Sequence, residues 1–176
     1  MKRLILVAVL LLSGCGTDVA PAPAAPAPAA GGPAAQSPAA AAPAASLTFA
    51  GKTIDGAAFD AASLAGKPAL LWFWAPWCAT CASQADSVAE MQKTYDGKLG
   101  VLGIAGLGSN AEMHEFVSDL EIPQVRTLDD QAGAVWRKFG ITQQSTYVLI
   151  DAAGKVVTSS YLDAEELPAK VKTLVG

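Results

Sequence analysis

Two cysteines near the middle of the 176-residue chain, Cys78 and Cys81, form a C-x-x-C pair. Thiols at this spacing can close a disulfide, and a thiolate of such a pair can attack a disulfide in another molecule. The chain has one more cysteine, Cys15, close to its N-terminus. The spacing predicts a redox-active disulfide between Cys78 and Cys81, which takes the place of a separate cofactor.

The segments around the pair indicate how it is held. Residues 69–74 form an unbroken apolar run, typical of a strand buried on both faces of a sheet, and Pro76 ends it. Apolar residues recur with helical spacing after Cys78, so we expect Cys78 at the N-terminal end of a helix and Cys81 one turn further in. The N–H groups and dipole of that helix favour a thiolate. Cys78 is therefore the expected nucleophile, and Cys81 the more buried resolving thiol.

The chain beyond the pair alternates between strand-like and helix-like segments. Strands are expected at residues 99–104, 125–128, 146–150 and 155–161, and helices at residues 111–120, 132–139 and 164–174. A turn at Asp151-Ala152-Ala153-Gly154 joins the last two strands. The pattern predicts an α/β fold of three layers, in which helices flank a central sheet.

The N-terminus has the features of an export signal. Lys2 and Arg3 precede an apolar run over residues 4–12, which is too short to span a bilayer as a mature helix. The next residues, Leu12-Ser13-Gly14-Cys15, resemble the lipobox that bacterial lipoprotein signal peptidase cleaves. Residues 1–14 are therefore the expected signal peptide, and Cys15 the lipidated first residue. An ordinary signal cleaved nearby would leave Cys15 as a free thiol, and the protein would still be exported.

Composition separates a linker from a domain. Residues 16–45 contain 15 Ala and 7 Pro, with Asp18 as the only charge, which favours a semi-stiff tether. A proline-rich ligand for a binding partner is the alternative. Residues 46–176 have a normal size for one domain, so we expect the lipidated cysteine and tether, residues 15–45, to precede a single domain.

Charge and ligand types argue against other classes of function. Loss of Lys2 and Arg3 with the signal takes the formal charge from −4 to about −6, which disfavours nucleic acid or an anionic membrane surface as a partner. With lipid on Cys15, the dithiol and the single histidine, His114, do not complete a tetrahedral zinc site, so no metal is expected. We expect His114 to be a solvated residue on a polar helix face.

The segment Trp72-Phe73-Trp74-Ala75-Pro76-Trp77-Cys78-Ala79-Thr80-Cys81 resembles the active-site segment of the thioredoxin superfamily, in its exported TlpA-like branch. The nearest likeness is to the actinobacterial DsbE/DsbF-type secreted disulfide oxidoreductases, and it covers nearly all of residues 46–176. It includes Met113-His114-Glu115-Phe116-Val117 and Phe139-Gly140-Ile141-Thr142-Gln143-Gln144. The resemblance implies a thioredoxin-like fold with a mixed central sheet, and it makes Cys78 and Cys81 the redox pair.

The resemblance also implies which residues surround the pair. Pro76 and Trp77 are expected beside the nucleophile, and the loop of Gln144, Ser145 and Thr146 is expected to contact the substrate peptide.

Three residues depart from the pattern of the resembling proteins. Trp72 replaces a buried Asp of thioredoxins, Gln84 replaces a Glu that is frequent in TlpA-like proteins, and Ser145 replaces a cis-proline. A cis bond before a residue other than proline costs roughly 2.5–4 kcal/mol, so we expect the Gln144–Ser145 bond to be trans and the loop to be reshaped. The Ser145 hydroxyl can then approach Cys78.

The replacements at Trp72 and Gln84 remove candidate bases that would deprotonate Cys81. An oxidant needs this help less than a reductant, so we expect an enzyme that oxidises cysteines in exported proteins. We expect it to act outside the cytoplasm as a monomer, lipid-anchored to a bacterial membrane and served by a membrane electron partner. The alternatives are a reductive protein of the cytochrome maturation type, a thiol-binding or chaperone-like module, a permanent disulfide staple, and a metallochaperone that uses His114.

Overall fold

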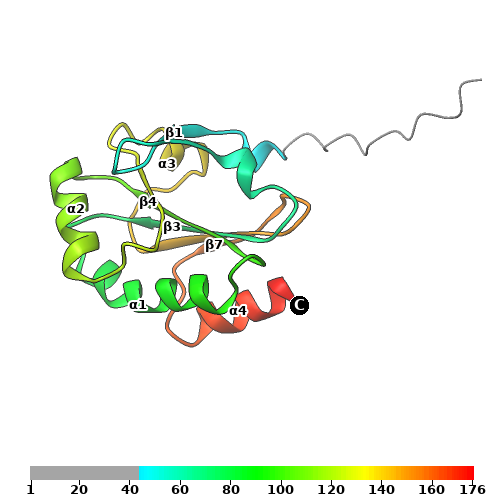
Figure 1. The fold of residues 1–176 in the computed structure, drawn as a ribbon. Helices are drawn as coiled ribbons and strands as arrows, with labels where there is room; N and C mark the ends of the chain where they lie inside the picture. Colours follow the sequence, from blue (N-terminus) through cyan, green and yellow to red (C-terminus); the bar gives the residue numbers. More distant parts are fainter. Residues whose placement is uncertain (1–43) are drawn as a thin grey trace, which may run out of the picture. The chain divides into compact units, whose positions relative to one another are not determined.

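A five-stranded mixed sheet forms the centre of the fold in the computed structural model, which describes residues 44–176 (Figure 1). Its strands are β3 (Ala69–Trp74), β4 (Gly100–Ala105), β5 (Thr127–Asp129), β6 (Thr146–Ile150) and β7 (Val156–Ser160). They lie in the order β5-β4-β3-β6-β7, with β3 parallel to β4 and antiparallel to β6. The helices are α1 (Ala79–Thr94), α2 (Asn110–Asp119), α3 (Ala134–Lys138) and α4 (Glu166–Val175). The predicted fold class, a central mixed sheet flanked by helices, is confirmed.

The side chains of β3 alternate between two apolar cores, one on each face of the sheet. Leu70, Trp72 and Trp74 belong to the core that includes α1, α2 and α4. Leu71 and Phe73 belong to the core that includes α3 and the N-terminal segments. In Figure 1, α1 and α4 lie below the sheet, and α3 lies above it together with β1. Because both faces are covered, every residue of β3 is buried, which explains its unbroken apolar sequence.

The helix α1 begins shortly after β3 ends, so it starts at the carboxyl end of the central strand. Cys78 is its N-cap residue and has an extended backbone conformation. The interior of the helix contains neither Gly nor Pro, so nothing in its sequence interrupts it. Its buried side chains, which recur at intervals of one, three or four residues, are Cys81, Gln84, Ala85, Val88 and Met91. Packing of this stripe against the sheet fixes both cysteines relative to β3.

The predicted elements agree closely with the structure. Residues 69–74 and 146–150 are strands with the predicted bounds, and the bounds of the other predicted elements shift by one or two residues. The sequence does not predict the hairpin of β1 (Ala50–Lys52) and β2 (Ala58–Asp60), or the short turns η1 (Ala45–Leu47) and η2 (Ala61–Leu64). These strands are three residues long and mostly exposed, so they show almost no alternation of apolar and polar residues.

Some of the predicted segments precede residue 44, where the described part of the chain begins. The expected signal peptide, Cys15 and all of the expected tether before residue 44 lie outside the described residues. Within residues 44–176, none of the helices combines the length and the apolar character that a membrane crossing requires.

Candidate active site

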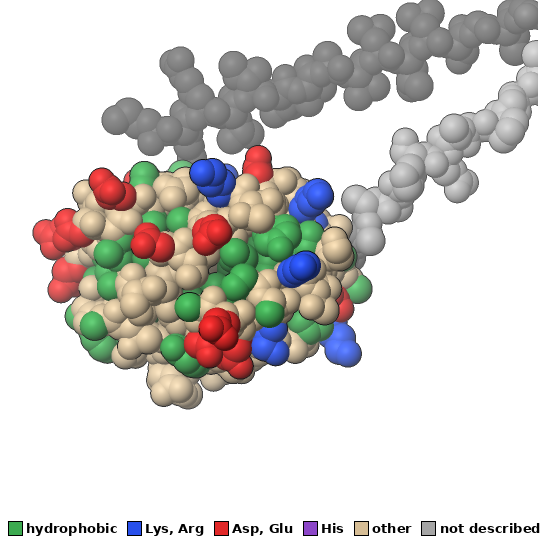
Figure 2. Space-filling model, turned by 90° about the horizontal axis from the view of Figure 1, so that it is seen from below, with side chains coloured by type: hydrophobic (Ala, Val, Ile, Leu, Met, Phe, Trp, Pro, Cys, Tyr) green, Lys and Arg blue, Asp and Glu red, His purple; other side chains and the backbone are tan. Residues whose placement is uncertain are grey.

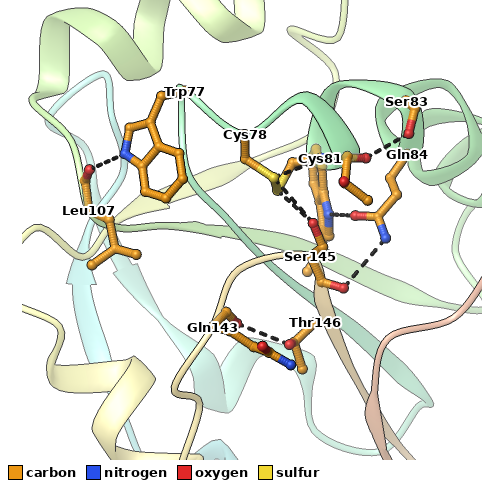
Figure 3. The surroundings of a disulfide bond; sticks show 11 residues. Trp77, Cys78, Cys81, Ser83, Gln84, Leu107, Gln143, Ser145 and Thr146 are labelled. Atoms are coloured by element: carbon orange, nitrogen blue, oxygen red, sulfur yellow. Dashed lines mark hydrogen bonds between the residues drawn. A yellow bond between two sulfur atoms is a disulfide. The ribbon is translucent and has the colours of Figure 1, made fainter.

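A disulfide joins Cys78 and Cys81 at the N-terminal end of α1, where their Cα atoms are 5.2 Å apart (Figure 3). The Cys78 sulfur accepts a hydrogen bond of 3.0 Å from the backbone N–H of Cys81. Cys78 is 6% exposed, whereas Cys81 is 0% exposed. The predicted order of burial is therefore confirmed, although Cys78 is itself more deeply covered than a freely exposed nucleophile would be.

The position of Cys78 favours a negative charge on its sulfur once the disulfide is opened. The first N–H groups of a helix have no partner within the helix, and its dipole is positive at this end. The N–H of Cys81 already faces the Cys78 sulfur. Groups that stabilise the thiolate make the reduced form more favourable, so they strengthen the disulfide as an oxidant.

Ser145 brings a hydroxyl group to both sulfur atoms. Its Oγ lies 3.2 Å from Cys78 Sγ and 3.1 Å from Cys81 Sγ, and the residue is 7% exposed. Its φ of 62° lies in the left-handed region, which residues other than Gly seldom adopt. Every peptide bond among residues 44–176 is trans, so the prediction for the Gln144–Ser145 bond is confirmed. The expected approach of the hydroxyl to Cys78 is also confirmed, and the structure adds the equal approach to Cys81.

The three residues that depart from the resembling proteins are connected to one another. The indole N–H of Trp72 donates to Gln84 Oε1 at 3.0 Å, and Gln84 Nε2 donates to the Ser145 carbonyl oxygen at 3.5 Å. Trp72 comes from β3. Figure 3 shows Gln84 on α1 and Ser145 on the loop before β6. The departures thus form one buried polar chain that ends at the disulfide, a relation that the sequence does not reveal.

A hollow of about 430 Å³ opens beside Cys78. Pro76 and Trp77 line it on one side, and Phe116 of α2 lines it on the other. Trp77 is 59% exposed, and its indole N–H donates to the Leu107 carbonyl oxygen at 2.7 Å. The hydrogen bond fixes this apolar ring beside Cys78, as Figure 3 shows, where it can contact a chain that approaches the sulfur.

The α2 side of the hollow is acidic, since Glu112, Glu115 and Asp119 line it. Figure 2 shows acidic side chains gathered at the end of the molecule where α2 lies, with most Lys and Arg side chains toward the opposite end. Glu112 also forms a capping box with Ser109, whose side chain and backbone donate hydrogen bonds that lower the pKa of Glu112. A ligand of Cys78 therefore meets negative charge at neutral pH.

The structure brings most of the predicted site residues together. Those that line the hollow or contact the disulfide are Pro76, Trp77, Cys78, Cys81 and Ser145. Gln144 is half-buried in the loop before Ser145. The Thr146 hydroxyl donates to the Gln143 carbonyl oxygen at 3.0 Å, so it does not serve the sulfurs. Leu107 is not among the predicted site residues, although it adopts a φ of 57° and its carbonyl oxygen accepts the hydrogen bond from Trp77.

His114 does not line the hollow beside Cys78. Its Nε2 lies 2.9 Å from the Ile54 carbonyl oxygen, and its Nδ1 lies 4.0 Å from the Asp55 carboxylate. The side chain is 45% exposed, so the prediction of a solvated residue holds for about half of its surface. In the part of the chain that the structure describes, no three His, Cys, Asp or Glu side chains gather closely enough to share a metal ion.

Comparison with known proteins gives concordant results. The family model described as Redoxin matches residues 37–175. The soluble secreted antigen MPT53 of Mycobacterium tuberculosis is 35% identical over 122 residues, which cover 65% of this chain and 68% of MPT53.

Two solved structures from the same organism are also similar. DsbF has a TM-score of 0.71 and 39% identity, over 76% of this chain and 99% of its own. A secreted disulfide oxidoreductase described as homologous to E. coli DsbE has a TM-score of 0.66 and 32% identity, over 73% of this chain and 98% of its own.

Proposed function

Because this chain belongs to the redoxin family and is a thiol-disulfide oxidoreductase of the thioredoxin type, we propose that it oxidises pairs of cysteine thiols in exported proteins. The observation that carries the proposal is the placement of the disulfide. Cys78 lies at a helix N-terminus beside an open hollow, and Cys81 lies buried behind it. A substrate thiolate can therefore reach one sulfur only, which fixes the order of the exchange steps.

In the first step the substrate thiolate attacks Cys78 Sγ. The bond between Cys78 and Cys81 breaks, the substrate becomes linked to Cys78, and Cys81 Sγ leaves with the electron pair. In the second step another thiolate of the substrate attacks the substrate sulfur of this mixed disulfide, and Cys78 leaves as a thiolate. Two electrons have then passed from the substrate to the protein, which now holds a dithiol.

The surroundings of the dithiol support oxidation as the favoured direction. The helix N-terminus and the N–H of Cys81 stabilise a thiolate on Cys78, and thereby the reduced form. In place of the carboxylate that is frequent in resembling proteins, this chain has Gln84, which does not ionise and which donates to the carbonyl oxygen of Ser145, the residue that contacts both sulfurs. A reductant must deprotonate its own resolving thiol, and the amide of Gln84 does not assist that step.

The proposed cellular setting follows from the N-terminal sequence and from the relatives. MPT53 is described as a secreted antigen, and the homologue of E. coli DsbE is described as a secreted disulfide oxidoreductase. We place this protein outside the cytoplasm, as a monomer anchored to a bacterial membrane by lipid on Cys15. Its substrates are exported proteins with cysteines, and a membrane electron partner reoxidises it by the same exchange in reverse.

A comparison of two assays tests the direction of exchange. The oxidised protein should restore the activity of a reduced, unfolded enzyme that needs its disulfides, at least about tenfold faster than air oxidation. The reduced protein should precipitate insulin, by cleavage of its disulfides, much more slowly than a thioredoxin at equal concentration. Fast insulin reduction without oxidative refolding would contradict the oxidase assignment and favour the reductive alternative. Absence of both activities would contradict exchange with protein substrates altogether.

Substitution of Gln84 tests the role of the missing carboxylate. Gln84→Glu should add a second ionisation to the pH profile of disulfide reduction, because a carboxyl at this 7% exposed position becomes a base only above a raised pKa. Above that pKa, reduction of insulin should accelerate by about tenfold or more. Stopped-flow rates between pH 5 and pH 9 measure this, with Gln92→Glu elsewhere on α1 as the control. A profile identical to the parent's would show that a base at this position does not reach Cys81.

A further inference from the structure

We propose that the Ser145 hydroxyl is a catalytic group that stabilises each sulfur as it leaves, first Cys81 and then Cys78. The inference rests on the exchange activity proposed above and names the donor that serves it. This role goes beyond the family resemblance, which implies a cis-proline at this position, because a proline has no hydroxyl group.

The geometry allows one hydroxyl to serve both sulfurs. Ser145 Oγ lies 3.2 Å from Cys78 Sγ and 3.1 Å from Cys81 Sγ, so it is nearly equidistant from them. A hydroxyl has a single hydrogen, which rotates about the Cβ–Oγ bond to the stronger acceptor. A thiolate is a far stronger acceptor than a sulfur in a disulfide, because its hydrogen bond is charge-assisted. The hydrogen bond therefore follows the negative charge without any movement of the backbone.

In the first step the substrate thiolate bonds to Cys78 Sγ, and the electron pair of the broken disulfide passes to Cys81 Sγ. Cys81 is fully buried, so solvent does not stabilise the charge that forms there. The Ser145 O–H donates to this thiolate and lowers the barrier to its departure.

In the second step the mixed disulfide breaks, and the electron pair passes to Cys78 Sγ. The same O–H turns to Cys78, where the N–H of Cys81 already donates. Cys81 gains one proton as it loses this hydrogen bond, which balances the proton that the second substrate thiol gives up when it becomes the attacking thiolate. The products are the substrate disulfide and a protein with one thiol and one thiolate.

Gln84 and Trp72 are positioning residues for this hydroxyl. The Gln84 amide donates to the Ser145 carbonyl oxygen, and the Trp72 indole fixes the orientation of that amide. These contacts help to hold Ser145 at a φ of 62°, a conformation that costs an L-residue roughly 1–2 kcal/mol. Such strain at a reactive group is typical of a functional constraint.

The test compares two substitutions that both remove the hydroxyl but differ in backbone preference. Ser145→Ala and Ser145→Gly should each raise the Cys78 thiol pKa by about one unit, since a hydrogen bond to a charged group is lost. Both should shift the equilibrium constant with glutathione about tenfold toward the oxidised protein, which corresponds to ~30 mV. The pKa is measured from thiolate absorbance at 240 nm, and the equilibrium constant from the fraction of oxidised protein.

Ser83→Ala is the matched control, because the Ser83 hydroxyl donates to the Thr80 carbonyl oxygen on the same helix and contacts neither sulfur. It should leave the pKa and the equilibrium constant at the parent values. Gln84→Met should raise the Cys78 thiol pKa by less than one unit. In the Ser145→Ala background it should raise that pKa no further, because Gln84 acts through Ser145.

Two results would overturn the inference. An unchanged pKa in both Ser145 variants would show that the hydroxyl does not stabilise the thiolate. A shift in Ser145→Ala but not in Ser145→Gly would show that backbone conformation, and not the hydroxyl, sets the pKa. Both measurements use the dithiol of the purified protein without a protein substrate. A failure here is therefore distinct from a failure of the refolding assay, which tests the proposed function itself.

Discussion

Substitution of Cys78 by serine should reduce catalysed oxidation of a dithiol substrate by roughly 10³-fold or more, since the sulfur that lines the hollow is lost. Cys81→Ser should lose turnover as well, but for another reason. Its Cys78 thiolate can still attack a disulfide in a substrate, and without Cys81 the resulting mixed disulfide persists. Non-reducing electrophoresis after incubation with an oxidised, unfolded protein measures this, in a Cys15→Ser background that leaves only the dithiol.

The two variants thus separate the roles of the two cysteines. A mixed disulfide should accumulate with Cys81→Ser and be absent with Cys78→Ser. Equal trapping by both variants would contradict the assignment of Cys78 as nucleophile. Trapping by Cys78→Ser alone would reverse the two roles.

Substitution of Trp72 by phenylalanine should destabilise the protein by about 1–3 kcal/mol more than the same substitution of Trp74. Both residues are fully buried on β3, and their rings stack with centroids 5.6 Å apart, so the loss of ring volume is similar. The Trp72 indole N–H donates to Gln84, whereas the Trp74 indole N–H is a buried donor without an acceptor among residues 44–176. Trp72→Phe leaves a buried Gln84 oxygen unpaired, and Trp74→Phe removes a donor that is already unpaired.

Urea unfolding of the two oxidised variants and the parent measures the difference, from midpoints and slopes. Trp72→Phe should also raise the Cys78 pKa, because the Gln84 amide loses its anchor. Equal destabilisation by both substitutions would show that the Trp72–Gln84 hydrogen bond contributes nothing to stability. The Cys78 pKa in Trp72→Phe would then show independently whether the Trp72–Gln84 hydrogen bond positions Ser145.

The sequence predicts the fold and the reactive pair well because both depend on local, strongly patterned segments. An apolar run with two covered faces predicts β3, and helical spacing after Cys78 predicts α1 and the cap position. The hairpin of β1 and β2 escapes prediction because its short strands are largely exposed. Such short strands form because they pair with another segment, and their own sequence carries little pattern that would predict them.

The buried polar chain could not be predicted, because it joins residues that are far apart in sequence. From the sequence alone, each of these residues is only a replacement of a group that the resembling proteins carry. Trp72, Gln84 and Ser145 then have no visible relation to one another. Their hydrogen bonds span 12 and 61 positions, so only the packing of β3, α1 and the loop before β6 brings them together. The left-handed φ of Ser145 is equally hidden, because Ser rarely adopts that conformation without a tertiary constraint. The position of α1 is predictable, whereas the group that faces its first turn is not.

The disulfide joins cysteines only three positions apart, so it closes a very small ring of chain. In polymer terms, such a ring removes little freedom from the unfolded protein. The loop-closure relation gives about 2 kcal/mol, against about 3 kcal/mol for a loop of 15 residues. The apolar cores on both faces of the sheet, and not this bond, therefore provide most of the folding free energy. The bond can open and close through many catalytic cycles while the surrounding architecture stays folded.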